Sequence, residues 1–84
     1  MSDKIRVLIV DDVATTRENI VKLMQFHPGI EAVGQAKNGE EALFQAKALR
    51  PDVVLMDINM PGMDGITATE RLTVEAPGTT IIIM

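Results

Sequence analysis

The sequence predicts a doubly wound α/β fold built on a parallel β-sheet. Three short apolar runs rich in Val and Ile occur along the chain, at residues 5–10, 52–58 and 79–84. Such nearly continuous runs are typical of strands that are buried on both faces, as in parallel sheets. Segments with helical spacing of apolar residues lie between the strands, so the two kinds of element alternate. The 84 residues suffice for one small domain.

The first strand and the first helix occupy the N-terminal third of the chain. Residues 5–10 are apolar except for Arg6. Either Thr15 or Thr16 is the predicted N-cap of the helix, and the Pro-Gly pair at 28–29 ends it. The apolar face of this helix is predicted from four residues at helical spacing: Ile20, Leu23, Met24 and His27.

A second strand and a second helix follow. Residues 31–36 have a mixed polar and apolar character, which suits a strand at the edge of a sheet. Asn38 and Gly39 are predicted to open the helix, and Pro51 to close it. The buried face is predicted from a set of apolar residues: Ala42, Leu43, Ala46 and Leu49.

The last two strands enclose the third helix. Residues 52–58 form the predicted third strand, and 79–84 the fourth. The helix is predicted over 66–76, and the Pro-Gly pair at 77–78 stops it. Three residues four positions apart indicate its buried face: Ala68, Leu72 and Ala76. Its several threonines lower the helix propensity of this segment.

Composition argues against several classes of function. Eight basic and twelve acidic residues give a net charge of −4, and no basic stripe is present, so we expect no direct contact with nucleic acid. The chain has no cysteine, which excludes disulfides and thiolate metal sites and suggests a cytoplasmic protein. No signal peptide or membrane-spanning apolar stretch is present, so we expect no membrane association.

Three carboxylates follow two of the predicted strands. Asp11 and Asp12 come after the first strand, and Asp57 lies near the end of the third. The ligand crevice of a parallel sheet lies beyond the carboxyl ends of its strands, so the three converge if these strands are neighbours. Two like charges about 4 Å apart repel by roughly 4 kcal/mol at intermediate dielectric, which favours a bound cation. Oxygen ligands point to Mg²⁺, with Mn²⁺ as the alternative. Beside this cation, Asp57 is the candidate nucleophile toward phosphorus.

Each of these residues also has a simpler interpretation. Asp11 and Asp12 could merely cap the first helix, although their pairing with Asp57 makes that less satisfactory. Arg17 lies one helical turn later and could pair either with the acidic pair or with Glu18 and solvent, of which we favour the second.

Two segments show a specific resemblance. VLIVDD at 7–12 and VVLMDINMPGMDG at 53–65 are similar to the signature segments of response-regulator receiver domains, especially of the chemotaxis type. The resemblance implies a flavodoxin-like sheet with strand order 2-1-3-4 for the strands present here. It also implies that Asp57 accepts a phosphoryl group from a sensor histidine kinase or phosphotransfer protein. The implied Mg²⁺ ligands are Asp12 directly, Asp11 through water, Asp57, and Asn59 through its backbone carbonyl.

The sequence departs from the receiver pattern at its C-terminal end. Receivers carry a Ser or Thr after strand four and a Lys after strand five, and the chain stops at Met84, before both. We therefore expect 1–84 to be the N-terminal portion of one receiver domain that lacks helix 4, strand 5 and helix 5. Such a portion should bind metal but be impaired in phosphorylation and switching. Its strand at 79–84 would be an exposed apolar edge, prone to self-association or domain swapping.

Two other functions stay open. The chain could be a truncated structural or folding fragment with vestigial chemistry, which its end inside an apolar strand would explain. Alternatively, it could be a Mg²⁺ phosphatase of the haloacid-dehalogenase kind, which also uses an Asp nucleophile. That family has an Asp two residues after the nucleophile, where this chain has Asn59. A receiver is not an enzyme in the usual sense, since at most it catalyses its own phosphorylation and dephosphorylation.

Overall fold

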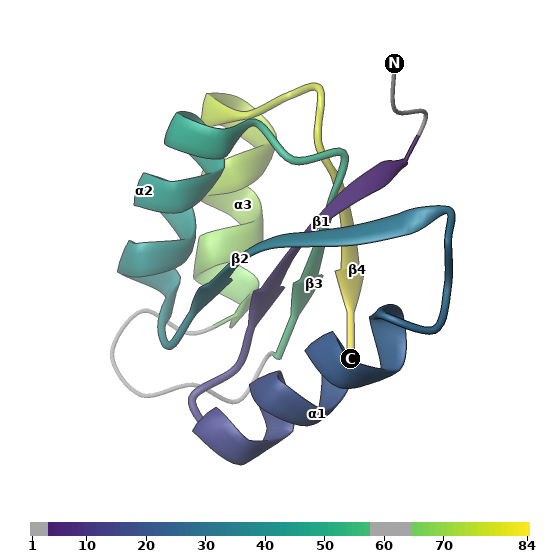
Figure 1. Ribbon diagram of the computed structural model, residues 1–84. Coiled ribbons are helices and arrows are strands. Elements are labelled where there is room, and N and C mark those ends of the chain that lie inside the picture. Colours follow the sequence, from purple (N-terminus) through teal and green to yellow (C-terminus); the bar gives the residue numbers. More distant parts are fainter. Residues whose placement is uncertain (1–3, 58–64) are drawn as a thin grey trace.

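The computed structural model describes residues 4–57 and 65–84 (Figure 1). Four parallel strands form one sheet in the order β2-β1-β3-β4, which confirms the predicted fold class and strand order. The strands are β1 (Ile5–Val10), β2 (Ile30–Ala36), β3 (Val53–Met56) and β4 (Thr80–Ile83). The helices are α1 (Ala14–Met24), α2 (Gly39–Leu49) and α3 (Gly65–Glu75). Within these ranges, no helix is long and apolar enough to cross a membrane.

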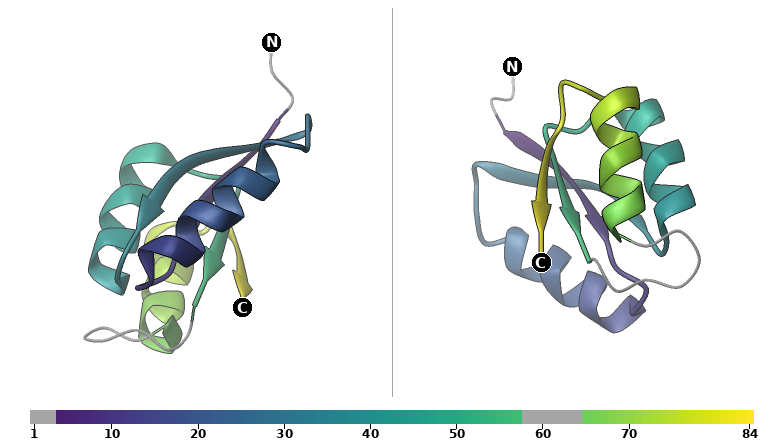
Figure 2. Two further views of the ribbon diagram at one scale, coloured as in Figure 1. Left: turned by 60° about the horizontal axis from the view of Figure 1, so that its bottom comes forward. Right: turned by 180° about the vertical axis from the view of Figure 1, so that it is seen from behind.

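The helices cover the two faces of the sheet unequally. Helices α2 and α3 lie side by side on one face, and α1 lies alone on the other (Figures 1 and 2). The core lies between the sheet and the α2–α3 pair. Side chains alternate along a strand, so every second residue of a strand points into this core. Its buried members from the strands and the two helices are Leu8, Val10, Ala36, Ala42, Leu43, Ala46, Val54, Met56, Ala68 and Leu72.

Helix α2 begins and ends at the residues that the sequence predicts. The Asn38 side chain accepts a hydrogen bond from the Glu41 amide at 2.8 Å, as an N-cap residue should. The Glu41 carboxylate in turn accepts from the Lys37 amide at 3.1 Å. At the other end Arg50 adopts a left-handed conformation with φ 50°, and Pro51 follows it.

Helix α1 differs from its prediction at both ends. Its N-cap is Val13 and no side chain caps it, so Thr15 and Thr16 lie inside the helix and the predicted threonine cap is wrong. The chain turns earlier because the Asp11 carboxylate accepts a hydrogen bond from the Val13 amide at 2.8 Å. At the other end the helix stops at Met24, and exposed His27 lies in the following turn.

Strand β2 is the predicted edge strand, and it carries an irregularity. Its register with β1 shifts between Val7 and Leu8, so that Leu8 pairs with Gly34. A Cβ atom at Gly34 would lie 2.6 Å from the Gln45 side-chain oxygen of α2. The absence of a side chain at this position therefore lets α2 pack closely against β2.

Candidate functional site

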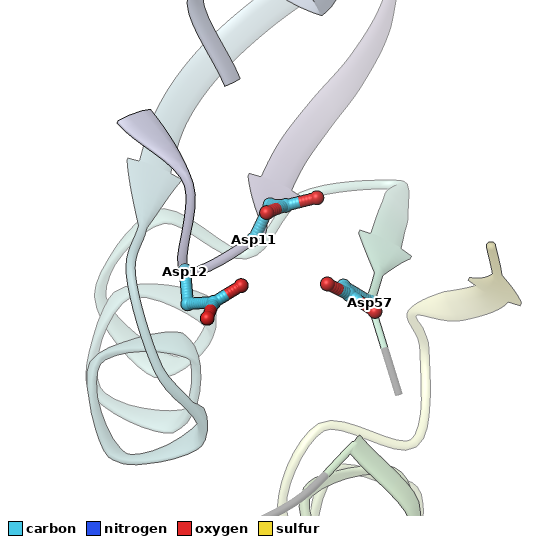
Figure 3. Close-up of side chains that lie close together, drawn as sticks. All are labelled: Asp11, Asp12 and Asp57. Carbon is cyan, nitrogen blue, oxygen red and sulfur yellow. The ribbon is translucent and has the colours of Figure 1, made fainter. Parts of the chain in front are cut away.

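Asp11, Asp12 and Asp57 meet at the carboxyl edge of the sheet, as predicted (Figure 3). Asp11 and Asp12 follow β1, and Asp57 follows β3, its direct neighbour. One carboxylate oxygen from each of the three residues lies within 4.8 Å of the other two. We call these three residues the acidic cluster.

Main-chain hydrogen bonds hold two members of the acidic cluster in place. The Asp11 amide donates to the Ala36 carbonyl of β2 at 3.1 Å, and the Asp57 amide donates to the Val10 carbonyl of β1 at 2.9 Å. Both bonds continue the sheet pattern one residue beyond the strands. The central position of β1 thus joins carboxylates that are distant in sequence.

The three carboxylates differ in how open they are to solvent. Asp11 is only 7% exposed, and one of its oxygens is engaged by the Val13 amide. Asp12 is exposed and Asp57 is half-buried, so both face the solvent at this edge. Such a cluster is electrostatically unfavourable by itself, and a hard divalent cation would relieve the repulsion.

The donor set of the acidic cluster is compatible with Mg²⁺ or Mn²⁺. All three side chains offer carboxylate oxygen, which is the donor that hard cations prefer. His27, the only histidine, follows the far end of α1 and is not a member of the cluster. Among residues 4–57 and 65–84, no other group of three or more metal-ligating side chains has this proximity.

Two basic residues near the carboxyl edge of the sheet, Arg17 and Lys37, make specific polar contacts. The Arg17 guanidinium donates to the main-chain carbonyl of Asp11 at 2.6 Å and to the Gln35 side chain at 3.3 Å. The interpretation that we favoured for Arg17, a solvent-directed surface residue, is therefore wrong. Lys37 forms an exposed ion pair with Glu41 at 3.8 Å. Sequence reasoning missed Gln35, since an exposed glutamine on an edge strand carries no signal.

The predicted contribution of Asn59 is not tested by the structure. Asn59 and the loop around it lie outside the described residues. The capping alternative for the acidic pair finds limited support, since Asp11 bonds the amide of the N-cap residue but is not itself the cap.

Comparison with known proteins identifies the family. The family model for the response regulator receiver domain matches residues 7–84. A protein-glutamate methylesterase/protein-glutamine glutaminase of Alkalilimnicola ehrlichii is 51% identical over 74 residues, which is 88% of this chain and 19% of the relative. The response regulator domain of Thermotoga maritima CheB superposes with a TM-score of 0.91 at 41% identity, covering 95% of this chain and 59% of that chain.

A second similar structure is the CheX–CheY–BeF₃–Mg²⁺ complex from Borrelia burgdorferi. It has a TM-score of 0.86 at 32% identity, and the match covers 93% of this chain and 59% of that one. The chain thus spans about a fifth of the methylesterase relative and about three fifths of the two solved chains. The matched family model covers nearly the whole chain, and both solved structures share its fold. The chain therefore belongs to the receiver domains of two-component signal transduction.

Proposed function

We propose that Asp57 is the phosphoacceptor of this receiver domain. The observation that carries the proposal is the acidic cluster, in which Asp57 presents a half-buried carboxylate beside Asp11 and Asp12. The donor would be a phosphohistidine on a sensor histidine kinase or phosphotransfer protein. A carboxylate oxygen of Asp57 attacks phosphorus, the bond between phosphorus and the imidazole nitrogen breaks, and the nitrogen keeps the electron pair. The product is a mixed anhydride on Asp57.

The surroundings of the three carboxylates favour Asp57 as the nucleophile. Asp11 is almost fully buried, and one of its oxygens is bound to a backbone amide, so it has little freedom to attack. Asp57 follows the short strand β3 at the centre of the sheet, and its amide is bound to β1. A fixed backbone with an accessible carboxylate suits an acceptor that must meet its donor in line.

We further propose that the acidic cluster holds Mg²⁺, or Mn²⁺ in its place. Asp12 and Asp57 would bind the cation directly and Asp11 mainly through water, with the Asn59 backbone carbonyl as a further ligand. When bound, the cation neutralises negative charge on the carboxylates and on the transferring phosphoryl oxygens. The Borrelia burgdorferi CheY complex, which contains Mg²⁺ and BeF₃, supports this assignment by similarity.

Acetyl phosphate tests the phosphoacceptor directly. The protein is incubated with acetyl phosphate and Mg²⁺, and intact mass spectrometry follows the addition of one phosphoryl group. We expect labelling that excess EDTA abolishes and that Asp57→Asn removes. Asp52→Asn is the matched control, because the Asp52 carboxylate binds the Arg6 amide instead of joining the acidic cluster. Labelling of Asp57→Asn at the wild-type rate would refute the assignment.

The 84-residue chain should be labelled slowly and should not switch normally. It contains no lysine after Lys47, so the lysine that the resemblance places opposite the phosphoryl group is not among its residues. One positive charge on the transition-state oxygens would then be missing. Rapid stoichiometric labelling would contradict this expectation.

A phosphatase of the haloacid-dehalogenase kind is separated from a receiver by turnover. A receiver should release no more than one equivalent of product from a generic phosphate ester such as p-nitrophenyl phosphate. The methylesterase activity named for several relatives is not proposed for residues 1–84, because the family model that matches them is the receiver domain.

We also propose that the chain self-associates through β4, with a second copy or a swapped element on its free edge. Strand β4 is outermost in the described sheet, and Ile82, Ile83 and Met84 are each between 45% and 48% exposed. No charged residue or proline interrupts this strand. Sedimentation velocity over a range of concentrations should show reversible dimers or larger species, and a monomer at the highest concentration would disprove the proposal.

A further inference from the structure

The strongest unassigned feature near the acidic cluster is the guanidinium of Arg17. Arg17 lies in the first turns of α1 and is half-buried. Its terminal nitrogen donates to the Asp11 main-chain carbonyl at 2.6 Å, and its Nε donates to the Gln35 side-chain oxygen at 3.3 Å. A planar guanidinium group that donates to two acceptors has little rotational freedom.

The main chain of Gln35, whose side chain is the second acceptor, is held by neighbouring elements. It pairs with Ile9 across the β1–β2 ladder, and its main-chain carbonyl accepts a hydrogen bond from the Gln45 side chain of α2. The Arg17 side chain therefore bridges α1, β2 and the loop after β1, and α2 supports β2 from the other face of the sheet.

The Asp11 carbonyl belongs to the peptide group that joins Asp11 to Asp12. Because a peptide group is planar, a hydrogen bond to its oxygen also restricts the amide and the Cα atom of Asp12. Asp11 is otherwise held through its amide and its carboxylate, by Ala36 and Val13. The turn closed by the Asp11 carboxylate and the Val13 amide spans this peptide group, and the Arg17 bond is the contact made to its carbonyl oxygen beside the exposed Asp12.

We propose that Arg17 is a positioning residue for the divalent cation. By binding the Asp11 carbonyl, it holds the Asp11–Asp12 peptide so that the Asp12 carboxylate faces Asp57. This inference rests on the proposed function, since it assigns Arg17 a role toward the cation of the acidic cluster. Groups that orient metal ligands in this way commonly alter metal affinity by about 10-fold or more when removed.

A purely electrostatic role for Arg17 predicts the opposite effect. A positive charge near three carboxylates opposes the binding of a cation, so its removal alone would strengthen Mg²⁺ binding. Positioning predicts weaker binding after the same change. The sign of the change in the Mg²⁺ dissociation constant therefore separates the two roles.

The test measures Mg²⁺ affinity in variants of the intact 84-residue chain by NMR titration. For Arg17→Ala we expect the dissociation constant to rise about 10-fold. Arg17→Lys keeps the charge but loses the fork, so it should bind more weakly than wild type and more tightly than Arg17→Ala. Lys22→Ala is the matched control, because it removes one positive charge from an exposed position on the same helix and should not weaken binding. Unchanged or tighter binding by Arg17→Ala would overturn the proposal.

A second measurement uses the metal-free protein in EDTA. Arg17→Ala should shift the ¹³C resonance of the Asp11 carbonyl and the ¹⁵N resonance of the Asp12 amide in the same peptide group, whereas Lys22→Ala should do neither. Unchanged signals at both atoms would also overturn the proposal. If wild type itself fails to bind Mg²⁺, the proposed function fails, yet these signals still decide whether Arg17 orients the peptide. If Arg17→Ala does not fold, Arg17→Lys provides both readouts.

Discussion

The two faces of the sheet are built to different degrees of completeness. On the face covered by α2 and α3, four side chains of β1 and β3 are fully buried and join one continuous core: Leu8, Val10, Val54 and Met56. On the other face Val7 and Ile9 of β1 are buried, whereas α1 contributes no buried residue and contacts mainly β1 and β2. By the alternation of side chains, Ile82 of β4 points to this second face, and it is 48% exposed.

This difference shows that a sheet can bring the acidic cluster together while one of its faces is partly open. The acidic cluster follows β1 and β3, the two central strands, whose hydrogen bonds to neighbours extend to Asp11 and Asp57. The uncovered apolar surface lies at β4, on the outer edge. The geometry of the acidic cluster is therefore separable from the exposure of β4. Substitutions on the two faces of the sheet should change the free energy of unfolding by different amounts.

The largest effect is expected in the closed core. Leu72 on α3 has no solvent exposure, so Leu72→Ala should lower the free energy of unfolding by about 2–5 kcal/mol through lost burial and a residual cavity. Val74→Ala on the same helix is the control, since Val74 is 79% exposed and should change the value by no more than about 0.5 kcal/mol. Urea unfolding followed by far-UV circular dichroism measures both. Equal losses would show that the two sides of α3 are not distinct.

A sharper comparison uses two neighbouring isoleucines of β4. Ile81 packs against the core on the α2–α3 face, whereas Ile82 points to the open face. Ile81→Ala should destabilise the fold by about 1–2 kcal/mol, and Ile82→Ala by less than about 0.5 kcal/mol. Both changes lose similar strand propensity, so the difference reports burial. A larger loss from Ile82→Ala in a monomeric sample would contradict the open face.

The beginnings of α1 and α2 provide the next contrast. Asn38 caps α2 through its side chain, so Asn38→Ala should cost about 1 kcal/mol. Thr15 lies inside α1 and caps nothing, so Thr15→Ala should cause no loss and should slightly favour the helix. Thermal unfolding followed by circular dichroism checks the pair. A loss of stability from Thr15→Ala as large as that from Asn38→Ala would indicate that Thr15 does cap α1.

The smallest effect is expected from the ion pair that links α2 and α3. A hydrogen bond from Lys47, at 3.0 Å, lowers the pKa of the Glu75 carboxyl, with a further contribution from Arg71. Because the folded-state pKa is depressed, this stabilisation is complete above the unfolded-state pKa and is lost as the pH falls through the folded-state value. Both partners are accessible to solvent, so added salt should weaken the effect.

Urea midpoints of wild type and Glu75→Gln, compared between neutral and acid pH, measure this contribution. We expect the two proteins to differ at neutral pH and to converge in acid. A difference that stays constant over the whole range would show that Glu75 acts through packing instead of charge.

Much of the fold follows from local patterns. The three apolar runs and the mixed segment 31–36 predicted the four strands to within one or two residues at each end, and Asn38 marked the start of α2 correctly. The acidic cluster followed from topology, because parallel strands place their carboxyl ends at one edge. The start of α1 was missed, since a cap by Thr15 and a turn formed by Asp11, four residues upstream, have similar sequence signals.

By itself the sequence determined the order of elements and the candidate residues of the acidic cluster, because the periodicity of burial is a local property. The strand order came from the resemblance to receiver domains. Only the tertiary structure decided that Arg17 binds the Asp11 carbonyl and shares its guanidinium with Gln35. It also decided that α1 leaves the β4 side of its face uncovered. These features depend on where side chains from separate elements meet, and that geometry exists only once the sheet and its helices have packed together.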